Sequence, residues 1–230
     1  MKSVLIIGAS SSIGKELIDV FLKNQYTVMG TYNNSKLQEQ ENLSSIKLDL
    51  DCNKSIDEFN DYIDLSKLNF DVCIFMSGIL PGKNLDEYSK KEIDNVMSTN
   101  FSGFAKLYKK LKNNLVDKSH LIIVSSISGQ RGSYDPIYAG SKGALISFVK
   151  SLSQIEPLRT RANVVAPALI QDSKMFQDMN PSRQKFHIES TPTKKLTKKE
   201  DIANIIFDMT KEHWSNVNGE VIKINGGTYV

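Results

Sequence analysis

Two side chains that could exchange a proton lie four residues apart in the segment Tyr138-Ala-Gly-Ser-Lys142. On a helix, the 3.6-residue period places the phenol and the ammonium on one face. A charged lysine beside a phenol favours the phenolate, so a tyrosine with an ordinary pKa of about 10 could act as a general acid or base on an alcohol or carbonyl group near neutral pH. The same spacing also occurs where a packed ring lies beside a lysine that extends to solvent. The pair therefore indicates catalysis only if the chain also builds a cofactor site.

A candidate cofactor site is the turn Gly8-Ala9-Ser10-Ser11-Ser12-Ile13-Gly14, which follows an apolar run and opens an amphipathic stretch. Glycine allows a tight turn and a close approach of the backbone to a pyrophosphate, and a helix N-terminus offers free N–H groups with a partial positive charge. The serine hydroxyls add donors. The spacing differs from the usual G-x-G-x-x-G, and a strand-to-helix turn without a ligand is the alternative.

The elements that must position these residues follow from an alternation of short apolar runs with longer amphipathic stretches, which predicts βαβ units and a parallel sheet. Strands are expected at about Ser3–Ile7, Thr27–Thr31, Ser45–Leu50, Asp71–Phe75, His120–Ser125, Ala162–Ala166 and Glu220–Ile224. Helices are expected at about Ile13–Lys23, Lys54–Leu65, Lys91–Leu115, Pro136–Glu156 and Lys199–Lys211, with a short one at Lys36–Asn42. The segment Gln171–Lys198 is expected to be irregular, as a lid or binding loop.

The bulk properties indicate one α/β domain over residues 1–230: a Rossmann-type, doubly wound parallel sheet of about seven strands with helices on both faces. A net charge of +3 is too small to indicate a nucleic-acid partner, and no apolar run is long enough for a membrane span or a signal peptide. Cys52 and Cys73 are the only cysteines, and no His/Cys cluster has metal-ligand spacing. We expect no metal site and a cytoplasmic location. Cys73 lies in an apolar run and is expected to be buried.

Along essentially its whole length, the chain resembles a classical short-chain dehydrogenase/reductase. The family's T-G-x-x-x-G-x-G turn is matched by Ile7 to Gly14, with Ile7 in place of the threonine and Ser12 in place of the middle glycine. The strand end Ile123–Gly129 resembles the family's serine-bearing segment, and counting back three residues from Gly129 selects Ser126. The resemblance also implies that the backbone carbonyl of Asn100 holds a water behind the active-site lysine. It thereby implies four catalytic residues: Asn100, Ser126, Tyr138 and Lys142.

Further segments resemble the family in the same chain order. Asp49-Leu50 is similar to the acidic residue and its neighbour that contact the adenine, and Asn163–Ile170 is similar to the segment that passes beside the nicotinamide. Phe75-Met76-Ser77-Gly78 stands where the family has N-N-A-G, so two asparagines that brace the sheet are replaced. The expected cofactor-binding residues are Gly8, Ser10, Ser11, Ser12, Ile13, Gly14, Thr31, Tyr32, Asn33, Asp49, Leu50, Ser77, Gly78, Tyr138, Lys142, Pro167, Ala168 and Ile170.

The tip of the second expected strand bears on the choice of cofactor. An acidic residue there would accept hydrogen bonds from the ribose 2′-OH and repel a 2′-phosphate. The segment Gly30–Lys36 contains no carboxylate, which favours NADP(H) over NAD(H). Thr31, Asn33 and Ser35 could donate to a phosphate, and Lys36 could supply charge.

The function that the resemblance implies is hydride transfer between a nicotinamide and a ketone, aldehyde or alcohol. Tyr138 would donate or accept the proton, Ser126 would hold the substrate oxygen, and Lys142 would lower the tyrosine pKa and bind the nicotinamide ribose. The most similar subgroup includes 3-oxoacyl-[acyl-carrier-protein] reductases, so a carrier-protein-linked 3-oxoacyl thioester is one candidate substrate. Ketones derived from sugars or secondary metabolites are others.

Two further functions remain open at this stage: a catalytically weak, dinucleotide-binding regulatory protein of the same fold, and a sugar-nucleotide epimerase or dehydratase. The filled catalytic positions favour the enzyme over the regulator, and the short substrate region argues against the epimerase. Because family members are commonly homotetramers that pair their long helices, we expect a homo-oligomer, either a tetramer or a dimer, formed through Lys91–Leu115 and Pro136–Glu156.

Overall fold

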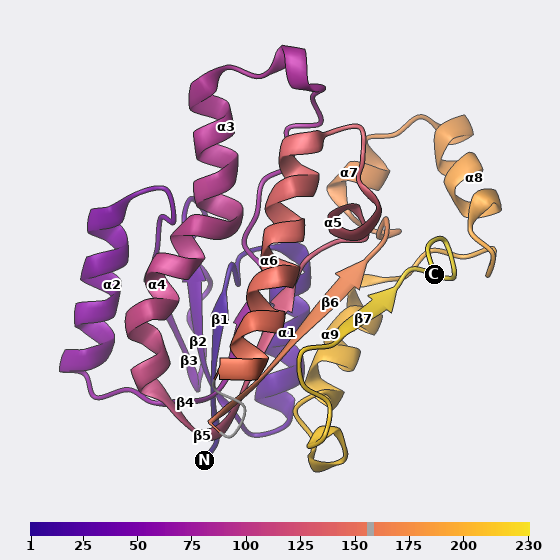
Figure 1. The fold of residues 1–230 in the computed structure, drawn as a ribbon. Helices are drawn as coiled ribbons and strands as arrows, with labels where there is room; N and C mark the ends of the chain where they lie inside the picture. Colours follow the sequence, from indigo (N-terminus) through magenta and orange to yellow (C-terminus); the bar gives the residue numbers. More distant parts are fainter. Residues whose placement is uncertain (156–158) are drawn as a thin grey trace.

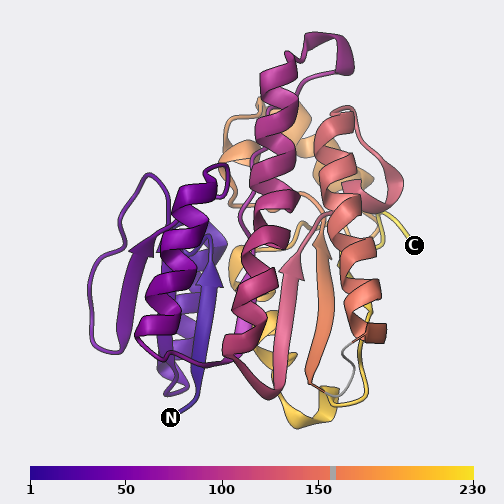
Figure 2. The same cartoon turned by 60° about the vertical axis from the view of Figure 1, so that its left-hand side comes forward.

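A seven-stranded parallel sheet forms the centre of the molecule and is covered by helices on both faces (Figures 1 and 2). The computed structural model describes residues 1–155 and 159–230. The strand order is β3-β2-β1-β4-β5-β6-β7, as expected for a Rossmann-type sheet. The strands are β1 (Ser3–Ile7), β2 (Thr27–Tyr32), β3 (Leu43–Lys47), β4 (Phe70–Phe75), β5 (Leu115–Val124), β6 (Thr160–Pro167) and β7 (Val221–Ile224).

The helices lie between consecutive strands, as right-handed parallel crossovers require. They are α1 (Ser12–Lys23), α2 (Asn53–Leu65), α3 (Lys90–Met97), α4 (Gly103–Leu111), α5 (Ser128–Arg131), α6 (Pro136–Ile155), α7 (Lys174–Gln177), α8 (Pro181–Ser190) and α9 (Lys199–Asp208). The last residue of the expected helix Pro136–Glu156, which corresponds to α6, lies outside the described residues. No helix in the described ranges is both long and apolar enough to cross a bilayer.

Each strand supplies two cores because its side chains alternate between the faces of the sheet. On β1, Leu5 and Ile7 pack in the core beneath α2, α4 and α6, whereas Val4 and Ile6 pack in the core beneath α1 and α9. All four side chains are fully buried. Continuous apolar runs are therefore the signature of strands that are covered on both sides.

The expectation of a helix at Lys36–Asn42 was wrong. This segment contains a single apolar residue, Leu37, which is buried against the sheet, so it has no apolar stripe with which to pack a helix. Asn42 instead adopts a positive φ of 59° and turns the chain into β3. That strand begins and ends earlier than expected, and Asp49 and Leu50 consequently lie in the connection after it.

The expected helix Lys91–Leu115 is broken into parts. A π-helical segment, Ser98–Ser102, joins α3 to α4, and Leu115 already belongs to β5. Such π segments are rare in proteins, and many of those that do occur lie at functional sites. The segment Gln171–Lys198 is likewise not irregular throughout, since it contains α7 and α8. The α8 helix begins where the Asn180 side chain caps its first turn.

Because all the strands run in parallel, their carboxyl ends meet at one edge of the sheet. The order of the strands reverses between β1 and β4, which are neighbours in the sheet although β2 and β3 separate them in the chain. This reversal is the topological switch point at which open α/β sheets bind ligands. It brings the turn after β1 beside the residues that follow β4.

Candidate active site

The turn after β1, Gly8–Gly14, is tightly packed at this switch point. Gly8 has a φ of 92°, and a Cβ atom built on it would lie 2.8 Å from the Ser77 Oγ atom, so there is no room for a side chain between the turn and the residues after β4. A Cβ on Gly14 would lie 2.5 Å from the Ala9 carbonyl oxygen. The Ser11 side chain accepts a hydrogen bond from Gly14 N at 3.1 Å and caps α1. These glycines fit the requirement for a backbone surface that a pyrophosphate can approach at a helix N-terminus.

The remaining residues expected around the adenosine lie on two neighbouring segments. Tyr32 and Asn33 are at the end of β2, where the Asn33 side chain is exposed. Thr31 is buried, and its Oγ1 atom accepts a hydrogen bond from Gly8 N at 3.1 Å, so this hydroxyl supports the turn. Lys36 is exposed and forms an ion pair of 2.8 Å with Glu39. This carboxylate, three residues beyond Lys36, partly offsets the charge of Lys36.

Lys142 lies within α6 and is almost fully buried, since only 4% of its surface is exposed to solvent. Its Nζ atom donates to the Val124 carbonyl oxygen at 3.1 Å, at the end of β5. Burial lowers the pKa of Lys142 to about 8, because removing the ammonium from water disfavours the charged form. The same ammonium lies 5.9 Å from the centre of the Tyr138 ring, so the helical spacing does bring the pair together.

Tyr138 and Ser126 meet at the carboxyl end of β5. The pKa of the Tyr138 phenol is raised, first by burial, while a hydrogen bond with Ser126 lowers it and the charge of Asp135 raises it again. The net direction is opposite to the one expected from the neighbouring lysine, because burial outweighs the other effects. The phenol is therefore protonated at neutral pH. Ser125, the neighbour of Ser126, donates to the Lys142 carbonyl oxygen at 2.8 Å and ties the strand end to α6.

Asn100 lies at the centre of the π-helical segment and is fully buried. Its side chain accepts from Ile79 N at 2.8 Å and donates to Ile79 O at 3.0 Å and to Ser141 Oγ at 2.9 Å. Ser141 in turn donates to the Tyr138 carbonyl oxygen at 2.7 Å. The Asn100 side chain thus connects the strand-end segment after β4 with the first turns of α6. Gly78 belongs to the same cluster, since a Cβ there would lie 3.1 Å from Lys142 Nζ.

On the far side, β6 ends with buried Pro167, followed by partly exposed Ala168 and Ile170. Ala168 N donates to Ile224 O at 3.0 Å, which fixes this segment to β7. The Asp172 side chain accepts from Lys199 N at 3.2 Å at the start of α9. A cavity of about 410 Å³ opens beside this segment. It is lined by Gln171, Asp172, Phe176, Gln177, Gln184, Lys198 and Glu200.

A family model described as Enoyl-(Acyl carrier protein) reductase matches residues 8–229, which is nearly the whole chain. The chain belongs to the classical short-chain dehydrogenase/reductase family. It is accordingly an NAD(P)-dependent dehydrogenase/reductase. Among curated proteins, it is 28% identical over 240 residues to the 3-oxoacyl-[acyl-carrier-protein] reductase of Buchnera aphidicola subsp. Schizaphis graminum, and 24% identical over 239 residues to that of Escherichia coli (strain K12). In both cases the match covers 100% of this chain and 98% of the relative.

Solved structures agree with this assignment. A short-chain dehydrogenase/reductase from Brucella melitensis, described as a glucose/ribitol dehydrogenase, superposes with a TM-score of 0.91 at 25% identity. The match covers 100% of this chain and 97% of that one. A 4-hydroxyisoleucine dehydrogenase complexed with NADH has the same fold, with a TM-score of 0.91 at 22% identity over 99% of this chain and 98% of that one.

The largest departure from the family pattern, Phe75-Met76, has a structural explanation. Phe75 is fully buried and stacks on Phe104 of α4, with ring centres 4.2 Å apart and an interplanar angle of 24°. An apolar stack therefore occupies the place of the replaced asparagine. Met76 is partly buried, and its sulfur lies 3.9 Å from Ser11 Oγ. Phe75 thus packs against α4, and Met76 contacts the turn after β1.

Sequence reasoning missed Asp135 and Ser141, which are both buried at the start of α6. A signal for Asp135 was present, because an Asp immediately before Pro136 is typical of a helix cap followed by a proline in the first turn. The Asp135 side chain does accept from Tyr138 N at 2.8 Å. No local pattern marks Ser141, since its partner Asn100 is 41 residues away.

Proposed function

We propose that this protein is an NADP(H)-dependent reductase that converts a ketone to an alcohol, with Tyr138 as the proton donor. The observation that carries the proposal is the meeting of a protonated Tyr138, Ser126 and a buried Lys142 at the carboxyl end of the sheet. When bound, the dinucleotide supplies the hydride. The residues of the chain bind it, orient the substrate and provide the proton.

For the cofactor, the backbone at Gly8–Gly14 and the N-terminus of α1 would receive the pyrophosphate. Asp49 and Leu50 would contact the adenine, and the segment Pro167–Ile170 would pass beside the nicotinamide. Preference for the 2′-phosphate rests on the neutral end of β2, where Asn33 is exposed and no carboxylate follows directly. The Lys36–Glu39 pair makes that preference moderate, since the lysine already has a counter-ion.

The proton chemistry follows from the environment of Tyr138. A carbonyl that is being reduced develops negative charge on oxygen, which requires a hydrogen-bond donor and then a proton. Because burial raises the pKa of Tyr138, the phenol holds its proton at neutral pH and can supply it to the developing alkoxide. Ser126 would hold the substrate oxygen. Lys142, with a pKa of about 8, can supply positive charge beside the phenol and return the proton to it.

For the substrate, we propose a 3-oxoacyl thioester. The support is the similarity over full length to the 3-oxoacyl-[acyl-carrier-protein] reductases named above. The cavity beside Phe176, which has polar and apolar lining, is compatible with a chain that carries a polar carbonyl. A carrier protein bearing the thioester would then be a partner of the enzyme.

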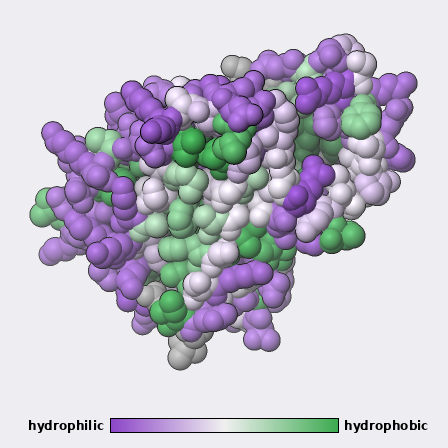
Figure 3. All heavy atoms as spheres, turned by 45° about the horizontal axis from the view of Figure 1, so that its top comes forward, coloured by the Kyte–Doolittle hydropathy of each residue, from purple (hydrophilic) through white to green (hydrophobic). Residues whose placement is uncertain are grey.

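We propose a homo-oligomer in which α4 and α6 form contacts between subunits. Phe101, in the π-helical segment that precedes α4, and Phe148 and Leu152, on α6, are only partly buried, and Ile155 at the end of α6 is 72% exposed. Figure 3 shows a weakly polar and apolar band across the middle of the front face, over α6, between hydrophilic margins. Burying such a band between subunits would remove apolar surface from water.

The test is the oxidation of NADPH and of NADH with an acetoacetyl thioester and a panel of other ketones. We expect turnover with NADPH to exceed turnover with NADH, and Tyr138→Phe to lower kcat by several orders of magnitude while NADPH binding, measured by fluorescence titration, is retained. The proposal would be refuted by a Tyr138→Phe variant with near-wild-type turnover. Tight nucleotide binding by a wild-type protein that reduces no carbonyl would instead indicate a regulatory protein.

A further inference from the structure

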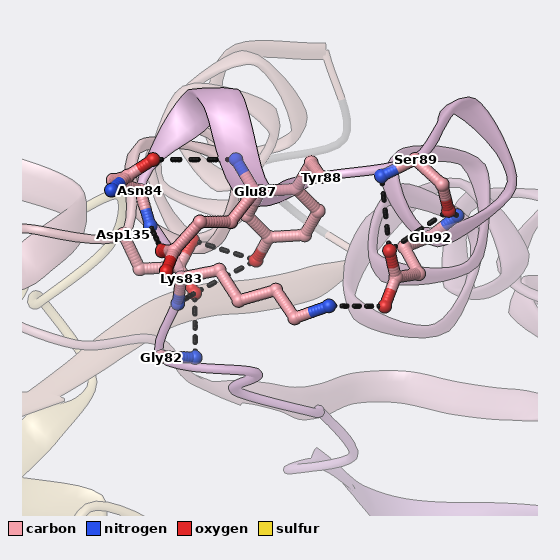
Figure 4. A network of polar contacts seen from close by, with 8 residues as sticks. All are labelled: Gly82, Lys83, Asn84, Glu87, Tyr88, Ser89, Glu92 and Asp135. Atoms are coloured by element: carbon pink, nitrogen blue, oxygen red, sulfur yellow. Dashed lines mark hydrogen bonds and ion pairs between the residues drawn. The ribbon is translucent and has the colours of Figure 1, made fainter.

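A buried carboxylate, Asp135, accepts hydrogen bonds from two separate parts of the chain. Figure 4 shows those that come from the segment after β4. It is 2% exposed and precedes α6 by one residue. Its Oδ1 atom accepts from Tyr138 N at 2.8 Å, and its Oδ2 atom accepts from Gly82 N at 2.9 Å and from Lys83 N at 3.4 Å. The Tyr88 hydroxyl lies 2.9 Å from one oxygen and 2.8 Å from the other. Both oxygens therefore act as acceptors, one toward the helix and the other toward the segment after β4.

That segment, residues 79–88, borders the candidate active site. Asn100 holds its first residue through both the N–H and the C=O group of Ile79. Asp135 holds its middle and its end through Gly82, Lys83 and Tyr88. The segment is thus fixed at both ends to elements that carry candidate catalytic residues.

Peripheral contacts support the same arrangement. Lys83 forms an ion pair of 2.5 Å with Glu92, which also receives hydrogen bonds from Ser89 and is part of a capping box at the start of α3 (Figure 4). These contacts hold the pKa of Glu92 at about 2. Unlike Asp135, Glu92 is about 40% exposed and is not among the groups that shift the pKa of Tyr138, so it is a control for the effect of charge on the pH profile.

We infer that Asp135 is a positioning residue for the proposed reaction: its buried carboxylate fixes the Tyr138 backbone and the 79–88 segment in one arrangement. The inference rests on the proposed function. Asp135 acts through the Tyr138 backbone and through the 79–88 segment, and it makes no contact that identifies it as a proton donor.

The chemistry explains why a carboxylate is needed here. An asparagine could still accept from Tyr138 N through its one oxygen, as a good helix cap does. Its amide NH₂ would then face the N–H groups of Gly82 and Lys83, so donors would oppose donors. Asp135→Asn is therefore expected to keep the helix cap and to release the 79–88 segment. Tyr88→Phe removes one donor to the carboxylate and preserves the ring.

The charge adds a readout that a purely structural role would not give. The groups that act on the Tyr138 phenol are Ser126 from the end of β5, Lys142 from the next turn of α6, and Asp135, whose negative charge raises the tyrosine pKa. Removing that charge lowers the pKa of Tyr138. Because reduction needs the protonated phenol, the alkaline limb of the pH profile for the reduction should move to lower pH.

The experiment compares wild type, Asp135→Asn, Tyr88→Phe and the control Glu92→Gln, with NADPH and an acetoacetyl thioester. For Asp135→Asn we expect a loss of about 10-fold to 100-fold in kcat/KM for the ketone, an alkaline limb displaced to lower pH, and a Kd for NADPH within about twofold of wild type. Tyr88→Phe should show a smaller loss, because three donors remain. Glu92→Gln should leave the pH profile unchanged.

Hydrogen exchange, measured without substrate, tests the arrangement independently of turnover. Amides in residues 79–88 should exchange faster in Asp135→Asn and Tyr88→Phe than in wild type. A folded Asp135→Asn variant with wild-type exchange and a wild-type pH profile would overturn the inference. If Asp135→Asn does not fold, unchanged exchange in Tyr88→Phe overturns it. If the wild type reduces no carbonyl, the proposed function fails, and the exchange experiment still decides whether Asp135 holds the segment.

Discussion

Replacing Lys142 by methionine should change the stability of the protein with a sign that depends on pH. The side chain is 4% exposed and its ammonium donates to the Val124 carbonyl oxygen at 3.1 Å. Burial lowers its pKa from 10.5 to about 8. The unfolded chain therefore holds this proton up to about pH 10.5, whereas the folded chain releases it near pH 8. Below pH 8, folding has to bury a charge.

The magnitude follows from the two pKa values. At about 1.4 kcal/mol per pKa unit, the difference between 10.5 and about 8 destabilises the wild type by about 3 kcal/mol below pH 8. Between pH 8 and 10.5 the unfolded state binds more protons than the folded state, so this destabilisation disappears as the pH rises. Methionine has a similar length and no charge. It does remove one hydrogen bond to Val124, at a cost of about 1 kcal/mol at any pH.

Lys142→Met should consequently be more stable than wild type by about 2 kcal/mol at pH 7 and less stable by about 1 kcal/mol near pH 10.5. Urea unfolding at a series of pH values measures this, at constant protein concentration because subunit association also contributes to stability. Lys106→Met, at an exposed lysine on α4, is the control and should show no such crossing. A stability difference between Lys142→Met and wild type that stays constant with pH would refute the reasoning.

Two further predictions concern packing around the site. In a urea titration, Phe75→Ala should lower the free energy of unfolding by about 3–5 kcal/mol, because it opens a cavity in the core. The control Phe186→Ala, at a side chain that is 64% exposed, should change the free energy of unfolding by less than about 0.5 kcal/mol. Equal effects would contradict the proposed packing of Phe75. Gly129→Ala would place a methyl group 2.7 Å from the Lys142 carbonyl carbon and should destabilise the folded protein by about 1–3 kcal/mol. In Gly140→Ala, the new methyl group meets open space on a helix and should stabilise the folded protein by about 0.5–1 kcal/mol. Thermal unfolding measures both changes. A stable, fully active Gly129→Ala variant would contradict the close contact of α5 with α6.

Much of the fold could be predicted because its signals are local. An apolar run such as Val4–Ile7 reports a strand covered on both faces, and alternation with amphipathic stretches reports parallel crossovers. Errors arose where a decisive contact lies elsewhere in the chain. The interruption at Ser98–Ser102 centres on Asn100, whose partners are Ile79 and Ser141. The error at Lys36–Asn42 was of another kind, because a segment with a single apolar residue, Leu37, has no apolar stripe with which to pack a helix.

The sequence by itself determined the family, the chain order of the candidate site residues and the meeting of Tyr138 with Lys142, because helical spacing is a property of neighbouring residues. Only the tertiary structure decided the electrostatics of that pair. Burial raises the pKa of Tyr138 and lowers that of Lys142, and burial depends on everything packed around them. Tertiary structure also decided the role that we infer for Asp135, whose partners Gly82 and Tyr88 lie 53 and 47 residues away. Hydrogen bonds between residues so far apart in the chain produce no repeating pattern of residue types from which they could be predicted.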